Sequence, residues 1–121
     1  MRRERNMIDM EAKAIYLEDA ERFIDGIPEK AQKKLYYNID MVCAGVRDDR
    51  IFKKLKDTDE IWEVRAKSAG IAYRVLSFWD TEKETLIVAT HGFVKKVQKT
   101  PKKEIERAER IRKEYFKNKQ T

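Results

Sequence analysis

Two arginines and a histidine in the second half of the chain have the greatest potential for chemistry. Arg74 lies between Tyr73 and Val75 in an apolar run, where a guanidinium is costly unless it is paired or faces water. A guanidinium can bind two phosphate oxygens at once. Two interpretations of Arg74 therefore remain open: it binds phosphate, or it forms a salt bridge with a carboxylate such as Glu63.

His91 is the only histidine, and it precedes the basic pair Lys95 and Lys96. A histidine at the end of a strand is more often structural than catalytic. Its side chain is nevertheless the one that titrates near neutrality without help, which suits proton transfer. The nearby lysines favour a catalytic role for His91, and Arg65 adds a further positive charge one strand earlier.

Other kinds of site find no support in the sequence. There is no glycine-rich phosphate loop, no Ser-His-Asp arrangement and no cluster with metal-ligand spacing. Cys43 is the only cysteine, so an internal disulfide is impossible and a reducing compartment is expected. We therefore expect no metal and no cofactor.

Positive charge is concentrated in the last quarter of the chain. Residues 1–94 contain 17 Lys and Arg against 18 Asp and Glu, a net charge of −1, whereas residues 95–121 contain 11 against 4, a net charge of +7. Such asymmetry favours a polyanionic partner, most simply RNA, through steering and counterion release. The alternative is a solvated helix face.

The elements that must position these residues follow from periodicity. Met10 to Leu17 could form a first strand, and apolar residues at helical spacing then predict two helices, from Glu18 and from Pro28 to Cys43. Asp48 to Asp59 is polar and suggests a loop. The helical hairpin and this loop precede the segment that carries the arginines.

Alternation of apolar and polar residues from Trp62 to Lys67 predicts a strand with one buried face. Further strands are expected at Ile71 to Trp79, after a tight turn, and at Thr85 to His91. A last helix, about residues 101–117, begins with Thr100 as its N-cap and Pro101 as its first residue. It carries most of the basic tail.

These elements predict an α+β fold in a single domain of 121 residues. We expect the helices to lie against one face of a small antiparallel sheet, leaving the other face free to form a shallow cleft. The charged first residues lead into no apolar segment of signal-peptide type, and no apolar run approaches the ~20 residues of a membrane span. A soluble protein of the cytoplasm is expected.

Four runs of sequence carry a resemblance to a known family. Residues 62–65 and 70–75, Trp-Glu-Val-Arg and Gly-Ile-Ala-Tyr-Arg-Val, resemble the core of RelE/ParE-superfamily toxins. The run 90–101, from Thr-His-Gly-Phe to Thr-Pro, and the run 52–56, Phe-Lys-Lys-Leu-Lys, are similar to the phage-derived, HigB-like branch. The resemblance covers about residues 14–116 and includes the element order. It implies a RelE-like sheet with an N-terminal helical hairpin on one face and a C-terminal helix.

The resemblance further implies a toxin of a type II toxin–antitoxin pair that cleaves mRNA in the ribosomal A site without metal. In such enzymes the 2′-hydroxyl attacks the adjacent phosphorus and the 5′-oxygen leaves. Arg74 matches the arginine that holds the scissile phosphate, Arg65 the basic residue on the preceding strand, and His91 the acid or base. Lys95 and Lys96, with Lys99, are expected to support the phosphate or contact ribosomal RNA.

The chain also departs from the RelE pattern. Ile61 and Glu63 occupy the strand on which RelE has lysines, so the general base is unassigned. Lys54 or Lys56 could reach the site only if their loop folds back over it. A cognate helix-turn-helix antitoxin is the expected protein partner. Two alternatives remain: a ParE-like toxin that inhibits gyrase by binding, and an inactive nucleic-acid-binding protein of the same fold.

Overall fold

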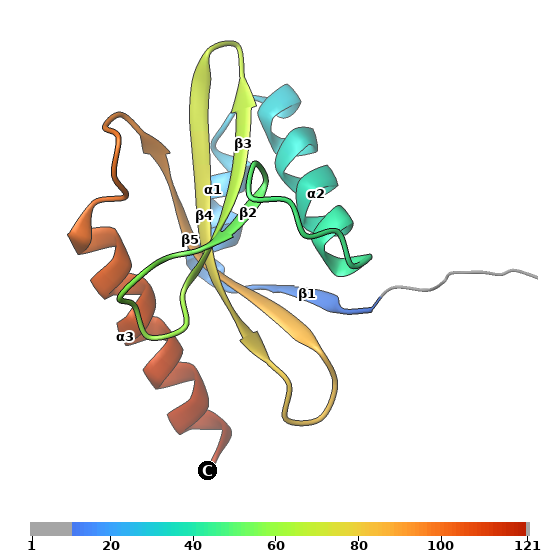
Figure 1. Cartoon of the computed structure of the whole chain (residues 1–121), viewed down its shortest axis with the longest axis vertical. Coiled ribbons are helices and arrows are strands. Elements are labelled where there is room, and N and C mark those ends of the chain that lie inside the picture. Colours follow the sequence, from blue (N-terminus) through green and yellow to red (C-terminus); the bar gives the residue numbers. More distant parts are fainter. Residues whose placement is uncertain (1–10, 121) are drawn as a thin grey trace, which may run out of the picture.

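The computed structural model describes residues 11–120, which form a mixed sheet with helices on both of its faces (Figure 1). The α+β class expected from the sequence is confirmed. The strands are β1 (Lys13–Tyr16), β2 (Phe52–Lys54), β3 (Trp62–Ser68), β4 (Ile71–Asp80) and β5 (Leu86–Lys95). The helices are α1 (Glu18–Asp25), α2 (Glu29–Cys43) and α3 (Lys102–Lys119).

The strand order in the sheet is β1-β5-β4-β3-β2, with antiparallel pairing throughout except that β1 joins β5 in parallel. The expected three-strand meander is β3-β4-β5. Its first turn contains Ala69 and Gly70, both with positive φ (52° and 78°), as the tightest antiparallel hairpins require. This turn fixes a register in which Arg65 lies directly opposite Arg74. The two arginines are thus cross-strand neighbours on one face.

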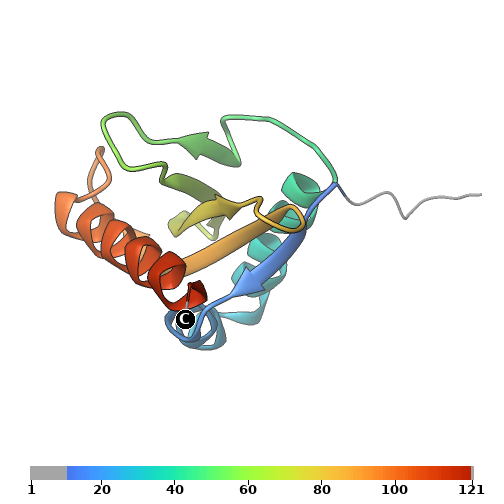
Figure 2. The ribbon, with the colours of Figure 1, turned by 90° about the horizontal axis from the view of Figure 1, so that it is seen from below.

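The two faces of the sheet are covered to different extents. Helices α1 and α2 cover one face, where Leu35, Val42, Val64 and Val75 belong to the larger buried core. Helix α3 lies on the opposite face, where Ala108 packs against Leu76 and Ile61 in a smaller cluster (Figure 2). The expectation that all helices share one face is therefore wrong, because α3 has its own apolar stripe to bury.

Helix α3 covers only part of that second face. Its aromatic residues Tyr115 and Phe116 pack against Phe78 on β4, and its N-terminal half lies over Leu76. The end of β3 and β4 that carries Arg65 and Arg74 projects beyond the helix (Figure 1). The face that was expected to be open is thus open at one end and closed at the other.

Several element boundaries differ from the sequence prediction. The segment interpreted as a loop contains strand β2, which pairs with β3 at the sheet edge, and β5 extends to Lys95. Thr100 does not cap α3, because its hydroxyl group is hydrogen-bonded elsewhere and Pro101 occupies the cap position. Met10, the expected start of the first strand, lies outside the described residues. Within residues 11–120 no helix combines the length and apolar character needed to cross a bilayer.

Candidate functional site

The arginine pair is organised around a buried carboxylate, that of Glu63 on β3. The Nε atom of Arg65 donates a hydrogen bond to Glu63 Oε1 at 3.0 Å, and the Nε atom of Arg74 lies 3.4 Å from the same oxygen. Glu63 is fully buried, whereas the side chains of Arg65 and Arg74 keep 25% and 15% of their exposure. The carboxylate therefore holds the inner edges of both guanidinium groups.

Thr100 completes this arrangement from the segment between β5 and α3. Its hydroxyl group donates a hydrogen bond to Glu63 Oε2, the oxygen that the arginines leave free. The bond ties the segment to the sheet. Glu63 therefore positions both the two arginines and the segment that contains Thr100. A helix cap was the role expected for Thr100, since a Thr before a Pro at a helix start contains no signal for a partner 37 residues away.

Two adjoining pockets open beside the arginine pair. The arginine pocket, about 540 Å³, is lined by Arg65, Ala72, Arg74, Lys95, Lys96, Val97 and Gln98. The loop pocket, about 450 Å³, is lined by Lys53, Lys54, Leu55, Lys56, Asp57, Arg65, Lys95, Gln98, Lys99, Thr100 and Ile105. Three residues, Arg65, Lys95 and Gln98, line both, so the pockets form one continuous depression, the basic cleft. All seven arginines and lysines proposed from the sequence line it.

The charge of the basic cleft is only partly compensated. Burial lowers the pKa of Arg74, with a further decrease from Arg65, against an opposing effect of Glu63. The pKa of Lys95 is also lowered, first by burial and then by the surrounding positive charges, again against Glu63. The Nε atom of Arg74 is shielded from solvent and has no hydrogen-bond partner. A bound anion would relieve this mutual repulsion, so the cleft suits a phosphate group.

The two open interpretations of Arg74 are compatible in this geometry. Arg74 lies at ion-pair distance from Glu63 and lines the arginine pocket at the same time. Its Nη1 atom donates to the Tyr73 carbonyl oxygen at 3.0 Å. The salt bridge orients the guanidinium group and does not remove it from the cleft.

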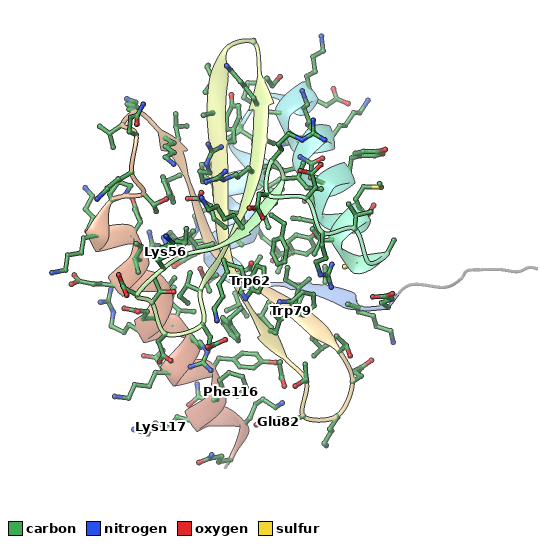
Figure 3. The ribbon with its side chains drawn as sticks, in the orientation of Figure 1. Lys56, Trp62, Trp79, Glu82, Phe116 and Lys117 are labelled. Atoms are coloured by element: carbon green, nitrogen blue, oxygen red, sulfur yellow. The ribbon has the colours of Figure 1, made fainter. Side chains whose placement is uncertain are left out.

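The loop between β2 and β3 folds toward α3, as a role for Lys54 or Lys56 requires (Figure 3). The backbone N–H of Asp59 donates to Glu109 at 2.8 Å, and the Asp59 carboxylate lies 3.2 Å from Arg112. These contacts with α3 hold the loop beside the cleft. Lys54 is 3.3 Å from Glu60, whereas Lys56 makes no ion pair with the described residues.

His91 lies on the same face but outside the cleft. It is in the middle of β5, and its side chain is 1% exposed beneath α3. Its Nε2 lies 3.1 Å from Glu104 and its Nδ1 lies 3.0 Å from Thr90. Burial lowers the pKa of His91, and Arg107 lowers it further, against opposing effects of Glu104 and Asp19. The Thr90 hydroxyl group donates its proton to the Leu76 carbonyl oxygen at 3.0 Å, so both ring nitrogens of His91 and their partners are enclosed in one buried hydrogen-bond network.

Part of the basic tail is also structural. Arg107 pairs with Asp19 on α1 at 2.8 Å, and Lys119 lies 2.6 Å from the buried Asp80. The Tyr115 hydroxyl group donates to the same Asp80 carboxylate at 2.7 Å. In contrast, Lys117 points away from the sheet (Figure 3) and, with Arg110 and Lys113, lines a shallow surface pocket of about 210 Å³. The charge of α3 thus divides into an inner set that holds the helix and an outer set that faces solvent.

Comparison with known proteins agrees with the fold. A family model described as "Phage derived protein Gp49-like (DUF891)" matches residues 22–113. A double mutant of the E. coli toxin RelE, in the free state, is similar in structure with a TM-score of 0.62 at 14% sequence identity, covering 85% of this chain and 98% of that one. No curated protein matches the sequence. The expected RelE fold is confirmed, whereas the HigB-like branch stays a prediction.

Proposed function

Because the chain belongs to the family of phage derived Gp49-like proteins and has the RelE fold, we propose that it is the toxin of a type II toxin–antitoxin pair. Its activity is the cleavage of mRNA in the ribosomal A site. The observation that supports this most directly is the arginine pair. The buried carboxylate of Glu63 holds Arg65 and Arg74 side by side, and both arginines line the basic cleft.

The cleft supplies the electrostatic part of the proposed reaction. The RNA 2′-hydroxyl group loses its proton to a base and attacks the adjacent phosphorus, the P–O5′ bond breaks, and an acid protonates the leaving 5′-oxygen. The products are a 2′,3′-cyclic phosphate and a free 5′-hydroxyl group. Negative charge grows on the phosphate oxygens during attack, and Arg65 and Arg74 stabilise it.

Lys95 is the strongest candidate for the base within the cleft. It lines both pockets, and its lowered pKa increases the fraction of neutral amine at a given pH. His91, in contrast, has both ring nitrogens bonded beneath α3. We therefore assign proton transfer to Lys95 in preference to His91. Lys54, Lys56, Lys96 and Lys99 surround the same depression and bind the RNA backbone or ribosomal RNA.

The proposed protein partner is a cognate antitoxin, a helix-turn-helix protein whose acidic segment covers the basic cleft. Such a segment would compete with RNA for the same positive charge. The proposed site of action is the cytoplasm, where ribosomes are found. Addition of the antitoxin is therefore expected to restore both growth and intact mRNA.

A second function, inhibition of gyrase by a ParE-like toxin, is favoured by the burial of His91. In the sequence, His91 beside Lys95 and Lys96 spoke only weakly against a protein that binds without cutting, and its burial removes that argument. If Lys95 does not transfer protons, the cleft is a binding surface alone, and the inactive nucleic-acid-binding alternative also stands.

Expression of the wild type and of an Arg65→Ala/Arg74→Ala double variant tests the proposal. The wild type is expected to arrest growth and to generate new mRNA 5′ ends within translated codons, and the double variant to do neither. Growth arrest with intact mRNA and altered DNA supercoiling would overturn the nuclease assignment in favour of the ParE-like one. Comparable expression of a Lys83→Gln variant, on the exposed β4–β5 turn, controls for general surface-charge effects.

A further inference from the structure

The two pockets of the basic cleft differ in the part of a ligand that they suit. The arginine pocket is open and lined mainly by charged groups. The loop pocket is also lined by charged residues, among them Asp57 and four lysines beyond the shared Lys95, but it adds two half-buried aliphatic side chains, Leu55 from the β2–β3 loop and Ile105 from α3. Leu55 packs against the small core cluster beneath α3, so this apolar surface is anchored. An apolar surface beneath a rim of lysines suits a ligand with a flat uncharged part and an anionic part.

The residues that line both pockets place the anionic part of such a ligand next to its uncharged part. Arg65 lines both pockets, so a phosphate that it binds is adjacent to whatever occupies the loop pocket. A second phosphate would be a poor occupant of the aliphatic surface, because burying its charge against Leu55 and Ile105 removes water without replacing it. A nucleobase has a planar apolar face and a polar edge. Its volume also fits within the 450 Å³ of the loop pocket, a size typical of small-ligand sites.

Resting on the proposed function, we propose that the loop pocket binds the unstacked nucleobase next to the phosphate held by Arg65 and Arg74. The substrate is therefore single-stranded RNA with one base turned out of the stack. A paired base in an A-form helix cannot enter, because its faces are covered by its neighbours. Gln98 lies between the pockets, and its side-chain amide can donate to or accept from a base edge.

The experiment measures binding separately from cleavage. A short fluorescent single-stranded RNA, 2′-O-methylated so that it cannot be cut, is compared by anisotropy with the same strand lacking one base and with its duplex. Stacking of a base on an aromatic side chain is worth ~1–3 kcal/mol, or ~5- to 150-fold in affinity, and the aliphatic surface of Leu55 and Ile105 is expected to give the lower end of that range. We expect at least a ~5-fold loss for an abasic residue at one position of the strand, and weaker binding of the duplex at equal salt.

Variants of the pocket residues test whether the loss of affinity for the abasic strand arises in the loop pocket. In Leu55→Ala and Ile105→Ala proteins the abasic penalty is expected to shrink, because the intact strand weakens while the abasic strand does not. Ile111→Ala is the matched control: the residue is also half-buried on α3 but lines a different pocket. It should leave the penalty unchanged. Circular dichroism melting of each variant separates loss of the pocket from loss of the fold.

The outcomes distinguish this inference from the proposed function. An abasic penalty that is absent, or identical in the Leu55→Ala and wild-type proteins, overturns the nucleobase pocket even if mRNA is cleaved. Duplex binding as tight as single-strand binding, or no binding at low salt, overturns it as well. A base-dependent affinity without any mRNA cleavage supports the pocket and refutes the nuclease.

Discussion

Two ends of one sheet face, only a few residues apart, have opposite characters. Arg74 lies opposite Phe93 on β5, and two positions along β4 Leu76 lies opposite His91. Side chains at these positions point to the same face. Arg74 nevertheless lines an open cleft and keeps 15% of its side chain exposed, whereas His91 is enclosed with both ring nitrogens bonded.

The position of α3 causes this difference. The helix covers the face as far as Leu76. It leaves uncovered the part of β4 that carries Arg74. Charged groups beneath the helix are compensated by partners, since Glu104, Arg107 and Asp19 surround His91. Arg65 and Arg74, beyond the helix, share Glu63 and each donate one bond to a backbone carbonyl oxygen, and both still line the open cleft. We therefore propose that one end of the face stabilises the protein and that the other acts on RNA. Variants at each end test that separation.

The largest effect is expected at the open end. Arg74→Ala should slow single-turnover cleavage of ribosome-bound mRNA by ~100-fold or more, the usual result of removing one group that stabilises transition-state charge. Arg74→Lys keeps the charge without the fork geometry and should recover only part of the rate. Cleavage by Arg74→Ala at nearly the wild-type rate would remove the arginine pocket from the reaction.

Glu63 is expected to affect both stability and rate. Glu63→Gln leaves two adjacent guanidinium groups without their shared carboxylate and weakens the contact with Thr100. We expect a loss of about 2 kcal/mol in the free energy of unfolding, with a smaller loss of cleavage than for Arg74→Ala. Urea unfolding measures the first quantity. Thr100→Val removes only the hydroxyl group and is the matched variant; its loss should be smaller than that of Glu63→Gln.

The sequence indicated the open end better than the closed one. Arg74 was identifiable because an arginine in an apolar strand needs a partner or a cleft, and the structure provides both. The lysines of the loop and of the β5 end were identified by the family resemblance and meet in the same depression. The fold class and the meander followed from periodicity, which depends on neighbours along the chain.

What the sequence could not provide was contact between distant segments. Whether His91 faces solvent depends on where α3 lies, and no local pattern at His91 reports that position. The bond between Thr100 and Glu63 and the docking of Asp59 on α3 are equally non-local. Strand β2 was missed because three residues, two of them lysines, contain too little alternation to predict a strand.

At the closed end, His91→Gln should change stability more than activity. Losing the ring's bonds to Thr90 and Glu104 should cost about 1 kcal/mol, with cleavage within a few-fold of wild type. The pKa of His91 lies below the ordinary 6.5 in the folded protein, so the unfolded chain takes up the proton first as the pH falls. The stability that neutral His91 contributes is thus present above pH 6.5 and lost as the pH falls through the lowered value.

This pH dependence is expected to be weaker in His91→Gln, because glutamine does not titrate. Urea midpoints measured above and below pH 6.5 for both proteins give the comparison, and acidic groups common to the two cancel. Loss of cleavage in a His91→Gln protein of normal stability would contradict the division of the face. It would mean that α3 moves aside to expose the histidine during the reaction.

The smallest effect concerns the outer surface of α3. Lys113 and Lys117 make no ion pair with the described residues and lie away from the basic cleft. If they bind ribosomal RNA, a Lys113→Gln/Lys117→Gln protein should show a shallower dependence of log affinity on log salt, by ~0.7 to ~0.9 for each phosphate that the protein no longer neutralises. Its cleavage rate at saturating ribosome concentration should stay unchanged, since the groups that we propose to contact the scissile phosphate are intact. An unchanged salt slope, equal to that of Lys83→Gln, would limit RNA binding to the cleft and make the outer charge of α3 a solvated helix face.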